Sequence, residues 1–101
     1  MRIVLKNIDL NGVTPSTERE KISEEDREFE NAIYESLVNR TYENDKHAIE
    51  EFWDTVQARL GLLQLTLGIN ADEVMEHYYL HEEKIKNRPR IKEINEQYKK
   101  Y

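Results

Sequence analysis

Two pairs of carboxylates are the residues of this sequence whose type and spacing could do chemistry. Glu25 and Glu28 form one pair, and Glu51 and Asp54 form the other. The two members of each pair are three positions apart in the sequence. On a helix, this spacing places both side chains on one side. Carboxylate oxygens suit a hard divalent cation such as Mg²⁺, with Mn²⁺ as an alternative. Two facing helices that carry these pairs would form a metal site.

The same acids have a simpler interpretation. A chain with 21 acidic residues places some of them near its core edge by chance, and their side chains are then only solvated. A single inward pair would favour this interpretation. Two inward pairs on facing helices favour the metal site.

The second pair lies in a long apolar pattern that begins after a cap at Asn44 or Asp45 and ends at Gly68. Seven apolar residues at helical spacing predict one packed side: Ile49, Phe52, Trp53, Val56, Leu60, Leu63 and Leu67. Glu51 and Asp54 fall on the opposite side, and below them the helix is apolar nearly all round. We therefore expect a central helix whose carboxylates face a second packing surface.

The first pair lies on a predicted helix that ends near Asn39. Its start is open between two capping-box spacings, one at Thr17 and one at Ser23. Glu25 falls within the apolar stripe and Glu28 at its edge, whereas Glu24 points away. The stripe consists of Ile22, Phe29, Ala32, Ile33 and Leu37.

The remaining segments are shorter. Residues 1–14 alternate weakly and predict a short strand or an extended arm. A third helix is predicted from a cap at Asn70 to about Arg88, and a short tail helix over residues 91–101. We therefore expect an all-α helical bundle over residues 15–90, preceded by the arm.

The third helix carries a basic ridge that includes His81, Lys84 and Arg88. These side chains could hold a phosphate whose other oxygens are bound by the metal. Alternatively, Lys84 and Arg88 only complement the dipole at the end of their helix.

Length, net charge and residue composition restrict the classes of protein to which this chain can belong. At 101 residues the chain is one domain with a modest core, so burial against a partner subunit is expected. Its net charge of -6 argues against binding a nucleic-acid polymer. The absence of cysteine excludes disulfides and thiolate sites. No apolar run predicts a membrane span or a signal peptide, so we expect a cytoplasmic protein.

Both acidic pairs occur in motifs that resemble those of a known family. Glu24-Glu-Asp-Arg-Glu28 fits EExxE and Glu51-Phe-Trp-Asp54 fits ExxD, in the order and at an interval used by the all-α nucleoside triphosphate pyrophosphohydrolases of the MazG-like group. The sequence from Glu50 to Gln57, followed by Gly61-Leu-Leu, is similar to small members often carried by phages and prophages. The resemblance covers roughly residues 22–88.

This resemblance implies a helical bundle, assembled as a homodimer or homotetramer, that uses Mg²⁺ to cleave a nucleoside triphosphate into monophosphate and pyrophosphate. It makes Glu25, Glu28, Glu51 and Asp54 the catalytic metal ligands, with Glu24 as a helper. It also implies that Lys84 and Arg88 bind substrate phosphate. His81 departs from the family pattern, since relatives often carry asparagine there, but we include it as a candidate substrate-binding residue. Two other hypotheses remain: a nucleotide-binding and metal-binding protein without turnover, and a helical oligomerisation protein whose acids are solvated.

Overall fold

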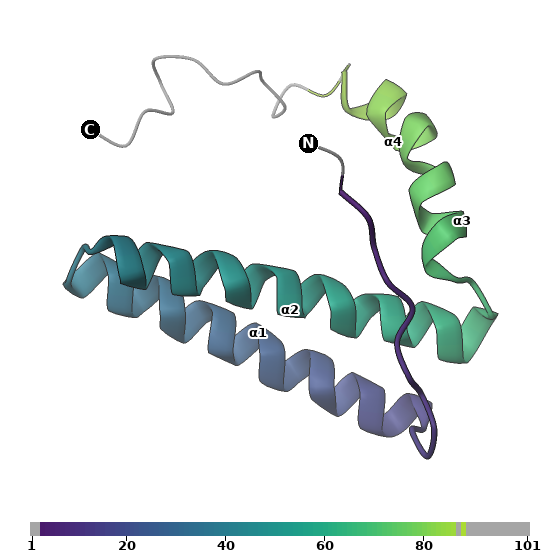
Figure 1. The fold of residues 1–101 in the computed structure, drawn as a ribbon, viewed down its shortest axis with the longest axis horizontal. Helices are drawn as coiled ribbons and strands as arrows, with labels where there is room; N and C mark the ends of the chain where they lie inside the picture. The colour runs from purple at the N-terminus through teal and green to yellow at the C-terminus, as the bar shows by residue number, and fades with distance from the viewer. Residues whose placement is uncertain (1–2, 87, 89–101) are drawn as a thin grey trace.

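The computed structural model describes residues 3–86 and residue 88. Regular structure within these residues is all helical: α1 (Pro15–Val38), α2 (Tyr42–Leu67), α3 (Ala71–Glu76) and α4 (Tyr78–Ile85). The first two helices form a long antiparallel pair, and α3 and α4 lead away from the C-terminal end of α2 (Figure 1). The predicted all-α class is confirmed. The predicted tail helix, residues 91–101, lies outside the described residues.

The start of α1 is set by Thr14. Its hydroxyl accepts a hydrogen bond from the Thr17 N–H at 3.1 Å, and the Thr14 N–H donates to the Thr17 hydroxyl at 3.0 Å. Pro15 takes the first helical position, where its missing N–H leaves no hydrogen bond unmade. The helix therefore begins before both of the predicted capping boxes.

The second long helix is capped by Thr41, whose hydroxyl accepts from the Asn44 N–H. Neither predicted cap residue, Asn44 or Asp45, has that role. The Asp45 carboxylate instead accepts hydrogen bonds from Arg40, at 2.8 and 3.2 Å, and from the Ser36 hydroxyl, which ties the two helices together beside their loop. The predicted end is correct, since Gly68 adopts the left-handed conformation with φ 67°.

The side of α2 that packs on α1 carries small and polar residues. The buried residues of the two helices are Glu18, Glu25, Ala32 and Ser36 on α1 and Thr55, Ala58, Leu60 and Gly61 on α2. The predicted apolar stripe of α2 is instead largely open, because Ile49, Phe52, Trp53 and Leu67 are exposed. The expectation that this stripe packs inward therefore fails at these four positions within one chain, whereas Leu60 of the same stripe is buried. Short side chains let two helices approach closely, whereas the larger residues of the stripe do not.

Residues 3–14 form an arm and no strand. The side-chain amide of Gln64 pairs with the backbone of Ile8, donating to its carbonyl at 3.2 Å and accepting from its N–H at 3.0 Å. The Asn7 side chain accepts from the Ala71 N–H at 2.8 Å. The arm thus fixes the corner between α2 and α3.

The predicted third helix is divided in two. Its cap is correct, since the Asn70 side chain accepts from the Glu73 N–H at 2.9 Å. The helix breaks at His77, however, and α4 ends at Ile85, before Arg88. The two parts have different surroundings, because α3 buries Ala71 beside the arm while α4 buries no residue.

The contact surface between α1 and α2, here called the seam, can be tested with Ala58→Leu. A large side chain in this buried position forces the helices apart, so we expect the free energy of unfolding to fall by about 1–3 kcal/mol. Gln57→Leu is the control, since its neighbouring position is exposed. Urea unfolding of both variants measures the difference, and equal stability of the two would contradict this packing.

Candidate metal site

Three of the predicted carboxylates converge across the helix pair. Glu25 and Glu28 on α1 and Glu51 on α2 each offer an oxygen atom, and these atoms all lie within 4.8 Å of one another. Here we call these three residues the carboxylate cluster. Three oxygens from two helices are a donor set suited to Mg²⁺, which usually takes few protein carboxylates and keeps water or phosphate in its other positions.

Burial distinguishes this cluster from a solvated acidic surface. The side chain of Glu25 is 7% exposed and that of Glu51 is 13% exposed. The Oε2 atom of each is buried and has no hydrogen-bond partner in the described part of the chain. A buried carboxylate oxygen without a partner is unfavourable. A cation bound by these carboxylates would remove that cost.

The other two predicted ligands lie outside the cluster. Asp54 is partly buried on α2, three residues after Glu51, but its carboxylate oxygens are not among the group that converges. Glu24 is exposed on the outer side of α1, so it acts on the cluster through its charge alone.

Two basic residues that were not predicted contact the cluster from opposite ends. The Lys21 ammonium lies 2.6 Å from Oε1 of Glu25, and the His47 ring lies 3.7 Å from Oε1 of Glu51. Each precedes its partner by four residues on the same helix, and the helices are antiparallel. The spacing was visible in the sequence, but it is common in surface pairs and does not by itself indicate a site.

The carboxylates perturb one another electrostatically. The pKa of Glu28 is raised, chiefly by the negative charge of Glu25, then by partial desolvation and by the charge of Glu51. The pKa of Lys21 is also raised, first of all because its ammonium donates a hydrogen bond to Glu25. Both shifts arise because negative charge is concentrated at the α1–α2 seam.

The predicted phosphate-binding residues lie elsewhere. His81 and Lys84 are exposed on α4, and Arg88 is exposed beyond its end. Close packing between helices joins α1 with α2, whereas α4 contacts chiefly α3, which precedes it across the break at His77, so α4 does not cover the cluster (Figure 1). Within one chain, the structure does not bring these three residues to the carboxylates. Lys84 does lie in the last turn of α4, as the helix-dipole interpretation requires.

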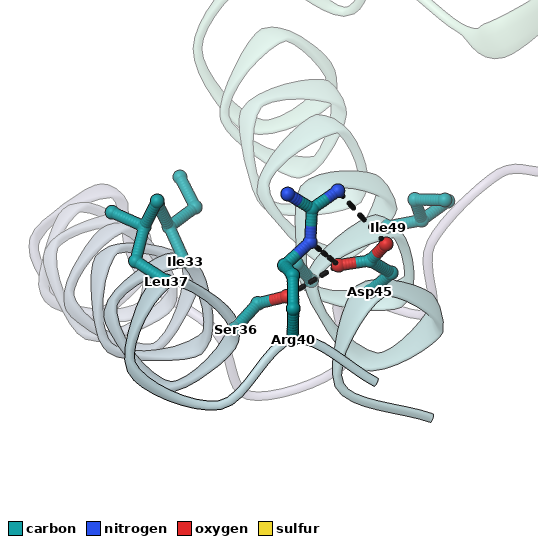
Figure 2. Close-up of a pocket in the computed structure, with 7 residues that line it drawn as sticks. Ile33, Ser36, Leu37, Arg40, Asp45 and Ile49 are labelled. Carbon is teal, nitrogen blue, oxygen red and sulfur yellow. Dashed lines mark hydrogen bonds and ion pairs between the residues drawn. The ribbon is translucent and has the colours of Figure 1, made fainter. Parts of the chain in front are cut away.

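The opposite side of the helix pair bears an apolar groove. One hollow in it, of about 230 Å³, is lined by Ile33, Leu37, Ala48 and Ile49 and closed at one end by Ser36, Arg40 and Asp45 (Figure 2). A second hollow is lined by Phe29, Phe52 and Val56 beside the ion pair of Asp26 with Arg59, at 3.0 Å. Leu37 follows Glu28 by nine residues, which places it about 180° around α1. The groove and the carboxylate cluster therefore face opposite ways.

Comparison with known proteins adds no assignment. No protein-family model matches the chain, and no curated protein or solved structure matches it significantly. Within the described residues, no helix has both the length and the apolar character needed to cross a membrane. The function must therefore be argued from the site.

The raised pKa of Glu28 gives a pH dependence that can be measured without metal. Because the folded protein holds this proton more tightly than the unfolded chain does, the Glu28 contribution to stability is complete below the ordinary value of 4.5 and is lost as pH rises through the folded pKa. We expect metal-free Glu28→Gln to be more stable than the wild type at pH 7. This advantage should shrink as pH falls towards about 4.5.

Urea unfolding with a chelator present, at a series of pH values, measures this difference. Glu20→Gln is the control, because it removes an exposed carboxylate of the same helix. A Glu28→Gln protein that is no more stable than the wild type at pH 7 would contradict the electrostatic description of the cluster.

Proposed function

We propose that this protein is a Mg²⁺-dependent nucleotide pyrophosphohydrolase that converts a nucleoside triphosphate into monophosphate and pyrophosphate. The observation that carries the proposal is that Glu25 and Glu51, which form one cluster with Glu28, each have a buried Oε2 atom without a hydrogen-bond partner among the described residues. The two sequence motifs add the reaction class, since the cluster residues are those that the resemblance assigns to the metal. A cytoplasmic protein would meet both Mg²⁺ and nucleoside triphosphates.

The proposal gives the carboxylates different roles. Glu25 and Glu51 would be the two buried ligands of the cation, and the more exposed Glu28 would complete the set. Bound Mg²⁺ would withdraw charge from the phosphoryl oxygens and lower the pKa of a coordinated water. Asp54, which lies outside the cluster on the same helix as Glu51, is the carboxylate left to accept a proton from the attacking water. Glu24 adds negative charge beside the cluster without contacting it.

An assay for pyrophosphate release tests the proposal. The full chain is incubated with Mg²⁺ and a panel of canonical and modified nucleoside triphosphates. We expect release from at least one of them, and a loss of about 100-fold or more in Glu25→Gln and in Glu51→Gln, since each removes a charged ligand. Glu50→Gln is the matched control, because Glu50 is exposed next to Glu51. No release by a folded wild-type sample would overturn the enzyme assignment.

We further propose that the chain assembles through the apolar groove as a homodimer. The pair of helices is about 36 Å long and about 20 Å wide, which offers about 700 Å² per partner. Stable interfaces bury about 600–1,000 Å² per partner, so a face of this size lies within that range. The chain also has no fully buried large side chain among its described residues, and a second copy would supply that core.

The binding of phosphate by His81, Lys84 and Arg88 would then depend on further assembly. Tyr78, Tyr79 and Leu80 are exposed on α4. Packing of these side chains on a neighbouring dimer, in a homotetramer, would bring α4 beside a cluster that it does not reach in its own chain.

The groove interface can be tested with Leu37→Glu and Ile49→Glu. A buried unpaired charge should weaken association at least about 30-fold, the loss expected for an interface hot spot. Tyr34→Glu is the matched control, because Tyr34 is 67% exposed, similar to Leu37 at 73%, but lies outside the groove. Sedimentation over a range of concentrations measures the masses. A monomeric wild type, or groove variants that associate as the control does, would contradict the interface.

A further inference from the structure

The cluster already contacts a cation of its own chain, at one end. Lys21 precedes Glu25 by one helical turn, and its ammonium lies 2.6 Å from Oε1 of Glu25. The two partners differ in burial, since the side chain of Lys21 is 50% exposed and that of Glu25 is 7% exposed. Lys21 thus neutralises a buried carboxylate from a position that remains in contact with water.

The contact is incomplete in a way that matters for metal binding. The ammonium pairs with Oε1 of Glu25, whereas Oε2 of the same side chain has no hydrogen-bond partner in the described part of the chain. Lysine carries a compact, strongly hydrated charge on a flexible stem. Because Lys21 is half exposed, its ammonium can move into water without disturbing buried packing, and Glu25 would keep its place at the seam.

We propose that Lys21 is a displaceable counter-cation of the carboxylate cluster, which holds Glu25 in place when no metal is bound and yields to an entering divalent cation. This inference rests on the metal site proposed above and adds a residue that sets its affinity. His47 does not serve equally well, since its ring lies further from Glu51, at 3.7 Å, and bears a charge only when protonated.

The proposal predicts an order of metal affinities. Lys21→Gln removes a positive charge that opposes the metal, so Mn²⁺ should bind about tenfold more tightly than to the wild type. Lys21→Arg keeps the charge and can bind the carboxylate through two parallel hydrogen bonds, so Mn²⁺ should bind more weakly than to the wild type. A purely structural lysine would give the opposite order, with the arginine variant closer to the wild type and the glutamine variant weaker.

The experiment titrates the full chain with Mn²⁺ alone and follows free Mn²⁺ by electron paramagnetic resonance. Lys46→Gln is the matched control, because it makes the same change in net charge at an exposed position on the far side of α2. Tight binding in Lys21→Gln, unchanged binding in Lys46→Gln and weak binding in Lys21→Arg would support the counter-cation. Equal affinities of Lys21→Gln and Lys46→Gln, or weaker binding in Lys21→Gln, would overturn it.

The outcomes separate this inference from the proposed function. If the wild type shows no saturable Mn²⁺ site, or if Glu51→Gln binds as the wild type does, the metal site itself fails. If the wild type binds Mn²⁺ and Glu51→Gln does not, the site holds and the order of the Lys21 variants decides the counter-cation alone. Should Lys21→Gln fail to fold, tighter binding in Lys21→Arg than in the wild type would still overturn the inference.

Discussion

The close approach of α1 and α2 is the constraint on which the rest of this structure depends. Ala32 and Ala58 are buried at the seam, and a Cβ added at Gly61 would lie 2.7 Å from a carboxylate oxygen of Glu18. At this separation, acidic side chains from both helices reach the same small volume, as Glu25, Glu28 and Glu51 do. A seam of leucines would hold the helices further apart, and the same acids would then be solvated separately. The small residues at the seam are therefore what allows the carboxylates of the two helices to form one cluster.

This arrangement opposes stability. Like charges raise the pKa of Glu28, and two buried carboxylate oxygens have no partner in the described residues. Contacts from Lys21 and His47 offset only part of that cost, because both basic side chains are half exposed. A helix pair selected for stability alone would place apolar residues at Glu25 and Glu51, since these are packed positions. Acids at these packed positions differ from those of an ordinary charged surface, which are solvated.

The spacing of apolar residues along α1 was sufficient to predict that Glu25 faces inward and Glu28 lies at the edge, because that helix has one apolar stripe. Helix-capping preferences likewise predicted that α2 ends at Gly68 and that Asn70 caps α3.

The contact side of α2 was not predictable in this way. Its apolar stripe shows that a surface must be covered but not whether α1 or a second chain covers it. The carboxylate cluster includes Glu51 and not Asp54, because a spacing of three residues places both on one side of a helix without fixing the distance of each oxygen from Glu25 and Glu28. The break at His77 has no glycine or proline to mark it.

The two sides of the helix pair also decide which side can face a second chain. Packing the side that carries the carboxylate cluster against a copy would bring two acidic groups together, each with buried oxygens that have no partner among residues 3–86 and 88. That interface would be opposed by charge repulsion and by further desolvation. The groove beside Leu37 and Ile49 meets less repulsion, since apart from Glu30 its charged lining residues are paired, Asp26 with Arg59 and Arg40 with Asp45. Assembly through the groove would leave both clusters on the outer surface of the bundle. There a triphosphate could approach from water, and the same sequence would provide a core on one side and a charged site on the other.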